Sequence, residues 1–348
     1  METGRVLLLL REAVRKIPSP LRRRYFLLKP FLTINQQMEL LENRGLVIED
    51  KNETANYLLS NNYYNIINGY GKYFTQGNDR YVTGTLFEEI SQLYLFDRKI
   101  KQALLEAILT SESHLKAIFA YRFAEVYRNM PYPYLNISCY DSNKILSVAE
   151  TISKLSKIIN RYQKINGSSI YDSIKKHNNV PIWILVNYID FGELRHMLSS
   201  CNTNLQNMVS KDMSNFILQH IEKPGLFSPE TMMSFIANMN DIRNICAHNN
   251  RLLDYRCRRD SKYWKPLHDK YNIAPNDERN SVYSVFLSLQ CFLSKEEYTR
   301  LHNTVKKHMI IHLQNNIHSI KPNTILHALG FPDDWFLLTK KLSQVSQT

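Results

Sequence analysis

The feature that most constrains the fold of this chain is a proline-free stretch from residue 31 to residue 130. Proline breaks helix interiors, so a stretch of this length without it favours long helices. Within it, apolar residues recur at helical spacing, among them Ile90, Leu93, Ile100, Leu104, Ile108, Leu115 and Phe119. Thr85–Glu88 has the pattern of a capping box. We therefore predict one helix from about residue 85 to about residue 126, long enough to cross a whole domain.

Further helices are predicted on both sides of this one. Thr33–Gln36 has the pattern of a capping box and Gly45 that of a helix end, so a short helix is expected between them. A second short helix would end near Gly69 or Gly71, and two such helices in tandem also fit a DNA-binding helix-turn-helix. The remaining expected helices cover residues 141–164 with Asp141 as N-cap, residues 228–248 beginning at Ser228-Pro229, residues 280–293 and residues 295–316.

The apolar run at residues 182–186 fits either a buried strand or a buried helix. We interpret it as a helix, because no second strand is available to pair with it. The predicted fold class is therefore all-α.

The chain is strongly basic, with a net charge of +12 and a pI of about 9.3. Such an excess attracts polyanions, so nucleic acid is the first candidate partner and an anionic membrane surface the second. The five cysteines are widely spaced and form no C-x-x-C pair, which speaks against a disulfide framework or a zinc site and favours a cytoplasmic protein. A run of about 20 apolar residues is missing, so no membrane span is expected.

The predicted helix 228–248 carries two contrasting stripes on a helical wheel. Its apolar stripe consists of Phe235, Met239, Ile242 and Cys246. The opposite, polar stripe consists of Ser234, Asn238, Asp241, Asn244 and His248. A polar stripe on a core-packed helix is expected either to face solvent or to line a cleft.

The end of this helix resembles the site of a known group of nucleases. Arg243 and His248 are separated by four residues, and Asn244 follows the arginine, which is similar to the R-x(4–6)-H signature of HEPN ribonucleases. The longer string from Asp241 to Leu253 resembles the same site in the abortive-infection (Abi) family, within the AbiD and AbiF group.

Other segments resemble the same family in the same order, over roughly residues 29–336. They are Lys29–Thr33 with Gln36 and Arg44–Leu46, Asn62–Tyr64 with Gly69-Tyr70, Phe96–Ile100, Val180–Trp183 with Phe191–Leu194, and Gly330–Pro332 with Trp335. The resemblance implies a HEPN-like helical bundle preceded by a small N-terminal helical subdomain. The expected division is an N-terminal extension at 1–28, the subdomain at 29–80, the helical core at 81–320 and a C-terminal segment at 321–348.

The resemblance also implies metal-independent RNA cleavage without a cofactor, in which the ribose 2′-hydroxyl attacks the adjacent phosphate. A histidine suits proton transfer near neutral pH, which is the role expected of His248. Arg243 would stabilise charge on the phosphate, and Asn244 would orient the phosphate or the imidazole. Asp241 would hold the His248 tautomer, and Arg251 would add phosphate contacts.

Two proton-transfer groups are needed and the chain carries one such motif, so a homodimer with a composite cleft is expected. Alternatively, Glu112, Ser113 and His114 on the long helix would line the cleft. The expected partners are substrate RNA and, by analogy with relatives, a cognate small noncoding RNA.

The resemblance thus implies an endoribonuclease that acts as an anti-phage toxin. Two alternatives remain open. One is a non-catalytic HEPN-like RNA-binding or scaffold protein. The other is a DNA-binding regulator that uses residues 33–70.

Overall fold

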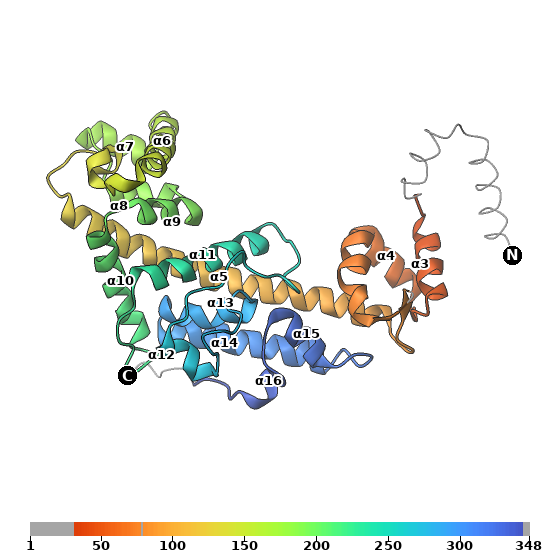
Figure 1. Ribbon diagram of the computed structural model, residues 1–348. Coiled ribbons are helices and arrows are strands. Elements are labelled where there is room, and N and C mark those ends of the chain that lie inside the picture. The colour runs from red at the N-terminus through yellow and green to blue at the C-terminus, as the bar shows by residue number, and fades with distance from the viewer. Residues whose placement is uncertain (1–30, 78, 344–348) are drawn as a thin grey trace, which may run out of the picture.

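A single long helix, α5 (Phe87–Val126), is the axis of the molecule, and most other helices pack along it or at its two ends (Figure 1). The computed structural model describes residues 31–77 and 79–343, so the extension expected at 1–28 lies outside the described residues. With 40 residues, α5 is about 60 Å long. Helices make up 67% of the structure and strands 2%, which confirms the all-α prediction.

The start of α5 lies one residue later than the capping pattern predicted, with Leu86 instead of Thr85 as the N-cap. Backbone hydrogen bonds from the Val47 amide to the Thr85 carbonyl and from the Phe87 amide to the Val47 carbonyl, each 2.9 Å, hold Leu86 in a parallel bridge with Val47. The helix therefore begins at Phe87, and the Glu89 carboxylate accepts a hydrogen bond from the Leu86 amide at 3.4 Å. Glu89, rather than Glu88, closes the first turn.

The N-terminal elements gather at the first end of α5 (Figure 1). Helix α3 (Ile34–Asn43) has the predicted capping box at Thr33, and the chain leaves it through Gly45 at φ +92°. The prediction of one second helix ending near Gly69 or Gly71 is wrong in part, because α4 ends at Ser60 and a separate π-helix follows it. The elements that follow α3 are α4 (Lys51–Ser60), the π-helix η1 (Tyr64–Asn68), the 3₁₀ helix η2 (Gly71–Phe74) and the antiparallel strands β1 (Thr75–Gln76) and β2 (Arg80–Tyr81), with Thr75 opposite Tyr81.

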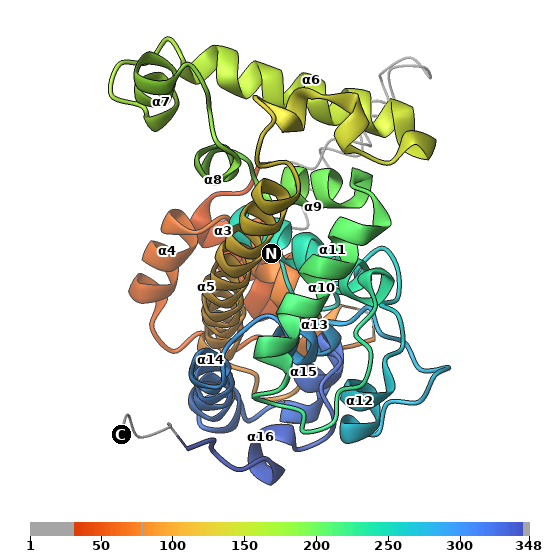
Figure 2. The same cartoon turned by 90° about the vertical axis from the view of Figure 1, so that its left-hand side faces the viewer.

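A second group of elements covers the other end of α5 (Figures 1 and 2). Asp141 caps the 3₁₀ helix η5 by accepting from the Asn143 amide, and the α-helix that was expected to follow this cap directly begins only at Ile145. The run after Pro181 is helical, which confirms that interpretation. These elements are η3 (Pro133–Leu135), η4 (Ile137–Cys139), η5 (Ser142–Lys144), α6 (Ile145–Tyr162), α7 (Ser169–His177), α8 (Ile182–Leu185), η6 (Val186–Tyr188) and α9 (Phe191–Ser200).

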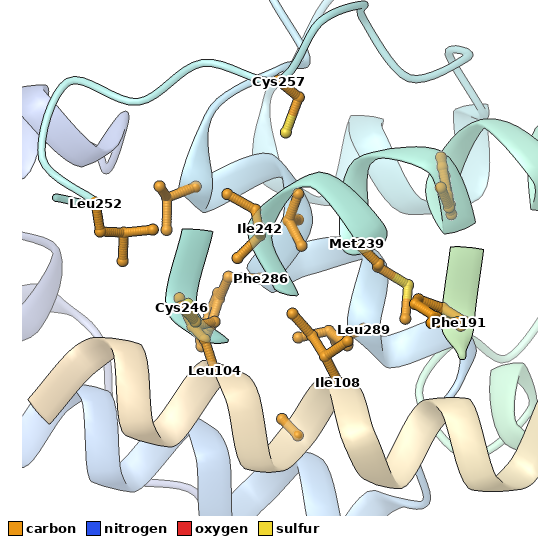
Figure 3. Packing of buried hydrophobic residues seen from close by; sticks show 14 of the residues in the cluster. Leu104, Ile108, Phe191, Met239, Ile242, Cys246, Leu252, Cys257, Phe286 and Leu289 are labelled. Atoms are coloured by element: carbon orange, nitrogen blue, oxygen red, sulfur yellow. The ribbon is translucent and has the colours of Figure 1, made fainter. Parts of the chain in front are cut away.

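The middle of α5 is packed by the helices that form the main core. Figure 3 shows Leu104 and Ile108 of α5 beside side chains of α11 and of the α13–η8 segment. The helices of this layer and its connections are α10 (Thr203–Ile217), α11 (Pro229–Ala247), α12 (Lys265–His268), η7 (Asp269–Tyr271), α13 (Val282–Ser288), η8 (Leu289–Cys291), α14 (Lys295–His308) and the π-helix η9 (Met309–Gln314). The helices expected at 228–248, 280–293 and 295–316 are thus present, the last with its capping box at Ser294.

The C-terminal segment packs into the same core. Helices α15 (Pro322–Leu329) and α16 (Trp335–Leu338) bury Ile325, Leu329 and Phe336, each at most 1% exposed. These side chains belong to the hydrophobic cluster that also contains α5 and α11. Among the residues that the structure describes, no helix combines the length and apolar character needed to cross a membrane.

Candidate functional site

Helix α11 carries the predicted site residues and is anchored firmly in the core. Its start is capped by the Ser228 hydroxyl, which accepts from the Thr231 amide at 3.1 Å, with Pro229 at the first position. Its apolar stripe is buried as predicted: Met239 and Ile242 are fully buried. Met239 lies beside Phe191 of α9, and Cys246 lies beside Leu104 of α5 (Figure 3). The helix is therefore a rigid platform for whatever its last turn presents.

The polar stripe of α11 is not one continuous open face, and the prediction for its first half is wrong. Its first members bind the segment of residues 257–280, which contains α12 and η7. The Ser234 hydroxyl accepts from the Lys262 amide at 2.9 Å, and the Asn238 amide donates to the Arg279 carbonyl at 3.3 Å. Asp241 accepts from the Arg258 amide at 3.2 Å. Asn238 is buried, Ser234, Asp241 and Asn244 are half-buried, and His248 at the helix end is exposed.

His248 is the C-cap residue of α11, and its side chain is exposed. Its backbone amide donates to the Asn244 carbonyl at 3.1 Å. Asn249 follows in the left-handed conformation at φ +53°, and the Asn250 amide donates back to the Ile245 carbonyl at 3.0 Å. This left-handed cap ends the helix and turns the chain sharply after the histidine. The imidazole is thus presented to solvent on an ordered helix end.

Arg243 and His248 do not share a face, because α11 is regular through Ala247 and the two positions lie about 140° apart. Asn244 lies between them around the helix. The Arg243 guanidinium donates to the Asn244 side-chain carbonyl at 3.4 Å, and Asn244 lies one turn before His248 on the same face. The Arg243 Nε is buried without a hydrogen-bond partner among the described residues, so the fold does not use the full donating capacity of this guanidinium.

The turn after His248 is held by a buried ion pair that the sequence analysis did not identify. Asp97 and Lys101 lie one turn apart on α5, are 1% and 4% exposed, and pair at 3.1 Å. The Lys101 ammonium donates to the Asn249 side-chain oxygen at 2.8 Å and to the Asn250 carbonyl at 3.1 Å. One Asp97 oxygen accepts from the amides of Leu252 and Leu253, at 3.0 and 3.1 Å.

A signal for this pair was present in the sequence. Asp97 and Lys101 are in phase with the apolar stripe of the predicted long helix, between Leu93 and Leu104. Two opposite charges at i and i+4 within a buried stripe are expected to pair, because an isolated buried charge is costly.

The same loop is tied to the N-terminal elements. Arg251 donates to the Gly69 carbonyl at 2.8 Å and to the Leu253 carbonyl at 3.3 Å. The Tyr70 hydroxyl donates to the second Asp97 oxygen at 2.8 Å. Burial, and then the Asp97 charge, raise the pKa of Tyr70, so its phenol remains a protonated donor. The segment 248–253 therefore lies where the N-terminal elements meet the core.

The remaining predicted residues are placed differently from the expectation. The Asp241 carboxylate also lies 3.8 Å from the Arg258 guanidinium, and no hydrogen bond joins Asp241 to His248 in the described part of the chain. His114 packs against other helices: its Nδ1 is 2.9 Å from the Phe292 carbonyl, and its ring stacks on Phe216. His114 is thus a satisfied packing residue, and Glu112 beside it pairs with Lys116 at 2.8 Å.

Metal ligands do not gather anywhere in residues 31–77 and 79–343, where no group of three or more histidine, cysteine or acidic side chains is placed to hold an ion. All five cysteines are buried and free of disulfide bonds. Burial raises the pKa of Cys246, the cysteine on α11, to about 12. This thiol therefore stays protonated and is a packing residue rather than a nucleophile.

Fold and site together define an all-helical protein that presents Arg-Asn-x₃-His at the exposed end of a core helix. The family model of Abi-like proteins matches residues 56–254, more than half of the chain. The chain therefore belongs to the Abi-like protein family, whose name points to abortive infection. The match contains the Asp97–Lys101 pair, α11 and the loop after it, and is shorter than the 29–336 expected from the sequence. No curated protein and no solved structure shows a significant match to this chain.

Proposed function

We propose that this protein is a metal-independent endoribonuclease of the HEPN type, related to the AbiD and AbiF group. In this proposal it acts as the toxin of an abortive-infection system by cleaving RNA. The observation that carries the proposal is the placement of His248. Its imidazole is exposed at the end of a fully packed helix, with Asn244 beside it and the following turn fixed by the buried Lys101. A proton-transfer group works best when its position is prepared in advance.

The reaction forms a bond between the ribose 2′-oxygen and phosphorus and breaks the bond from phosphorus to the 5′-oxygen of the next nucleotide. One group accepts the 2′-hydroxyl proton, and another donates a proton to the departing 5′-oxygen. The products are a cyclic 2′,3′-phosphate and a free 5′-hydroxyl. His248 carries out one of these transfers, since an imidazole exchanges protons near neutral pH.

Arg243 and Asn244 act on the phosphate. A guanidinium stays charged and presents forked donors that match phosphate oxygens, so Arg243 stabilises the negative charge of the pentacoordinate transition state. The Arg243–Asn244 hydrogen bond holds the two groups next to each other. Arg251 is held by the Gly69 carbonyl, and it adds positive charge on the side of His248 that faces the N-terminal elements. The net charge of +12 attracts the RNA to the protein.

The second proton-transfer group comes from a second copy of the chain. One exposed His248 per protomer provides either the acid or the base, and a two-fold axis places two of them across one cleft. The active form proposed here is therefore a homodimer in which His248 of the partner subunit completes the reaction. Light scattering should give the mass of a dimer.

The test is incubation of pure protein with total RNA in the presence of a chelator. His248→Ala should lower the cleavage rate at least about 100-fold, the lower end for loss of a general acid or base. Arg243→Ala should lower it similarly, and wild type should be unaffected by the chelator. The fragments should carry 5′-hydroxyl ends that a polynucleotide kinase labels without prior phosphatase treatment.

The control is His177→Ala. His177 ends α7, is exposed, and is followed by Asn178 in the left-handed conformation, as His248 is followed by Asn249. This variant should cleave like wild type. Cleavage by folded His248→Ala at the wild-type rate would overturn the assignment, and RNA binding without cleavage by wild type would favour a non-catalytic RNA-binding protein.

A further inference from the structure

A pocket of about 220 Å³ lies directly beside the loop that follows His248. One wall consists of Asn249, Asn250 and Arg251, the three residues after the histidine. The other walls come from η1 and the residues after it and from Tyr94 of α5. The pocket is smaller than the roughly 300–1,000 Å³ of sites for drug-sized ligands, so it suits a group about the size of a nucleobase.

The side chains that line the pocket are of the kinds that bind unpaired RNA bases. Three tyrosine rings, from Tyr64, Tyr70 and Tyr94, offer faces and edges for stacking. Asparagine amides from η1 and from the loop offer both donors and acceptors, which the hydrogen-bonding edge of a base requires. Arg251 is the sole charged residue of this lining, and no carboxylate contributes to it from the described residues. The pocket therefore favours a polar aromatic group attached to an anion.

The pocket is organised before any ligand binds. Tyr70 is fixed by its hydrogen bond to Asp97 and packs edge-on against Tyr94, with ring centroids 5.4 Å apart. Asn249 is oriented by Lys101, which donates to its side-chain oxygen and leaves the NH₂ as the donor end of that amide. Tyr64 belongs to a π-helix, a rare conformation that is frequent at functional sites. Rigid walls reduce the entropy lost on binding.

Asp97 and Lys101 hold both the pocket walls and the turn that follows His248. Asp97 holds Tyr70 on the pocket side and the Leu252 and Leu253 amides on the loop side. Lys101 holds Asn249, which both lines the pocket and follows His248 directly. The same two residues therefore fix both the pocket walls and the turn that follows His248.

We propose that this pocket binds one unpaired nucleobase next to the scissile phosphate and thereby sets the cleavage-site preference of the protein. The role in cleavage-site preference rests on the proposed ribonuclease function, whereas base binding itself is testable without cleavage. The pocket requires a base that is not stacked in a duplex, so the substrate class is single-stranded or looped RNA.

The test uses Tyr64→Ala and Asn65→Ala, with Tyr121→Ala and Asn207→Ala as matched controls. Tyr64 and Tyr121 are similarly exposed, at 62% and 63%, and Tyr121 lies outside this pocket on α5. Asn65 and Asn207 are both exposed. These substitutions remove surface side chains, so the variants should fold, and thermal unfolding checks this.

The measurement is cleavage of a randomised pool of short single-stranded RNA, with the cut sites sequenced. Wild type should prefer particular bases at one position beside the cut. Tyr64→Ala should raise KM about tenfold or more, since stacking on one aromatic ring contributes about that much. Asn65→Ala should flatten the base preference, and both controls should match wild type.

The outcomes separate the two proposals. If wild type cleaves RNA and the pocket variants keep its KM and base preference, the pocket proposal is overturned while the ribonuclease proposal stands. If wild type does not cleave, the ribonuclease proposal fails, and fluorescence anisotropy with the same labelled RNA decides the pocket. Binding about tenfold weaker in Tyr64→Ala than in Tyr121→Ala supports a base pocket, and equal binding overturns it.

Discussion

Lys101→Met tests whether the buried ion pair of α5 holds the loop after His248. Methionine keeps the length and apolar stem of lysine but removes the ammonium, with its ion pair to Asp97 and its hydrogen bonds to Asn249 and Asn250. Breaking one partner from a buried pair costs about 3–5 kcal/mol. Asp97 retains three donors, namely the Tyr70 hydroxyl and two backbone amides. We therefore expect the lower end, about 3 kcal/mol of unfolding free energy.

The assay is urea unfolding followed by tryptophan fluorescence, since Trp264 and Trp335 are buried in the core. Asp97→Asn and the double variant complete a cycle. Removing both charges leaves no unpaired ion, so the double variant should be more stable than the sum of the single losses predicts, by more than about 1 kcal/mol. RNA cleavage should also fall in Lys101→Met, because the loop that follows the helix end of His248 loses two of its anchors.

The control for this prediction is an exposed pair with the same spacing. Lys154 and Glu150 lie one turn apart on α6 and pair at 2.8 Å, with 40% and 65% of their side chains exposed. Lys154→Met should change stability far less, because solvent screens an exposed pair. Equal losses in Lys101→Met and Lys154→Met, or additive losses in the Asp97–Lys101 cycle, would refute the reasoning.

Two further predictions concern stability. Gly330, at φ +79°, ends α15, and a Cβ there would collide with the Ser281 side chain, whereas Gly167, at φ +82°, has open space around it. Gly330→Ala should therefore lower the unfolding free energy by about 2–5 kcal/mol, and Gly167→Ala only by the roughly 1–2 kcal/mol of left-handed backbone strain. Equal losses in urea unfolding would contradict the collision. Burial lowers the pKa of His268 and His302 from 6.5. Below about pH 6.5 the unfolded chain therefore binds protons that the folded chain does not. The contribution of these histidines to stability is complete above that pH and is lost as the pH falls. The urea midpoint should decrease between about pH 7.5 and 5.5, and it should decrease less in His302→Gln; a wild-type slope in that variant would show that His302 does not contribute.

Local signals in the sequence were sufficient for most of the helices. Capping patterns at Thr33, Ser228 and Ser294 each marked a true helix start, because a cap is made by residues within one turn of each other. The run after Pro181 was assigned to a helix for want of a partner strand, and the structure agrees. The N-cap of α5 was predicted one residue early, because the bridge between Val47 and Leu86 joins positions far apart in the chain.

The motif Arg243-Asn244-x₃-His248 and its place at a helix end followed from the sequence alone, because spacing along one helix determines which side chains share a face. Tertiary structure alone decided what surrounds it. The segment at 257–280 binds Asp241 and leaves His248 exposed, while Asp97 and Lys101 hold the turn that follows His248. The contacts of Lys101 with Asn249 and of Asp97 with Leu252 join residues about 150 positions apart. No local pattern specifies which distant partner a buried charge or a polar stripe will meet.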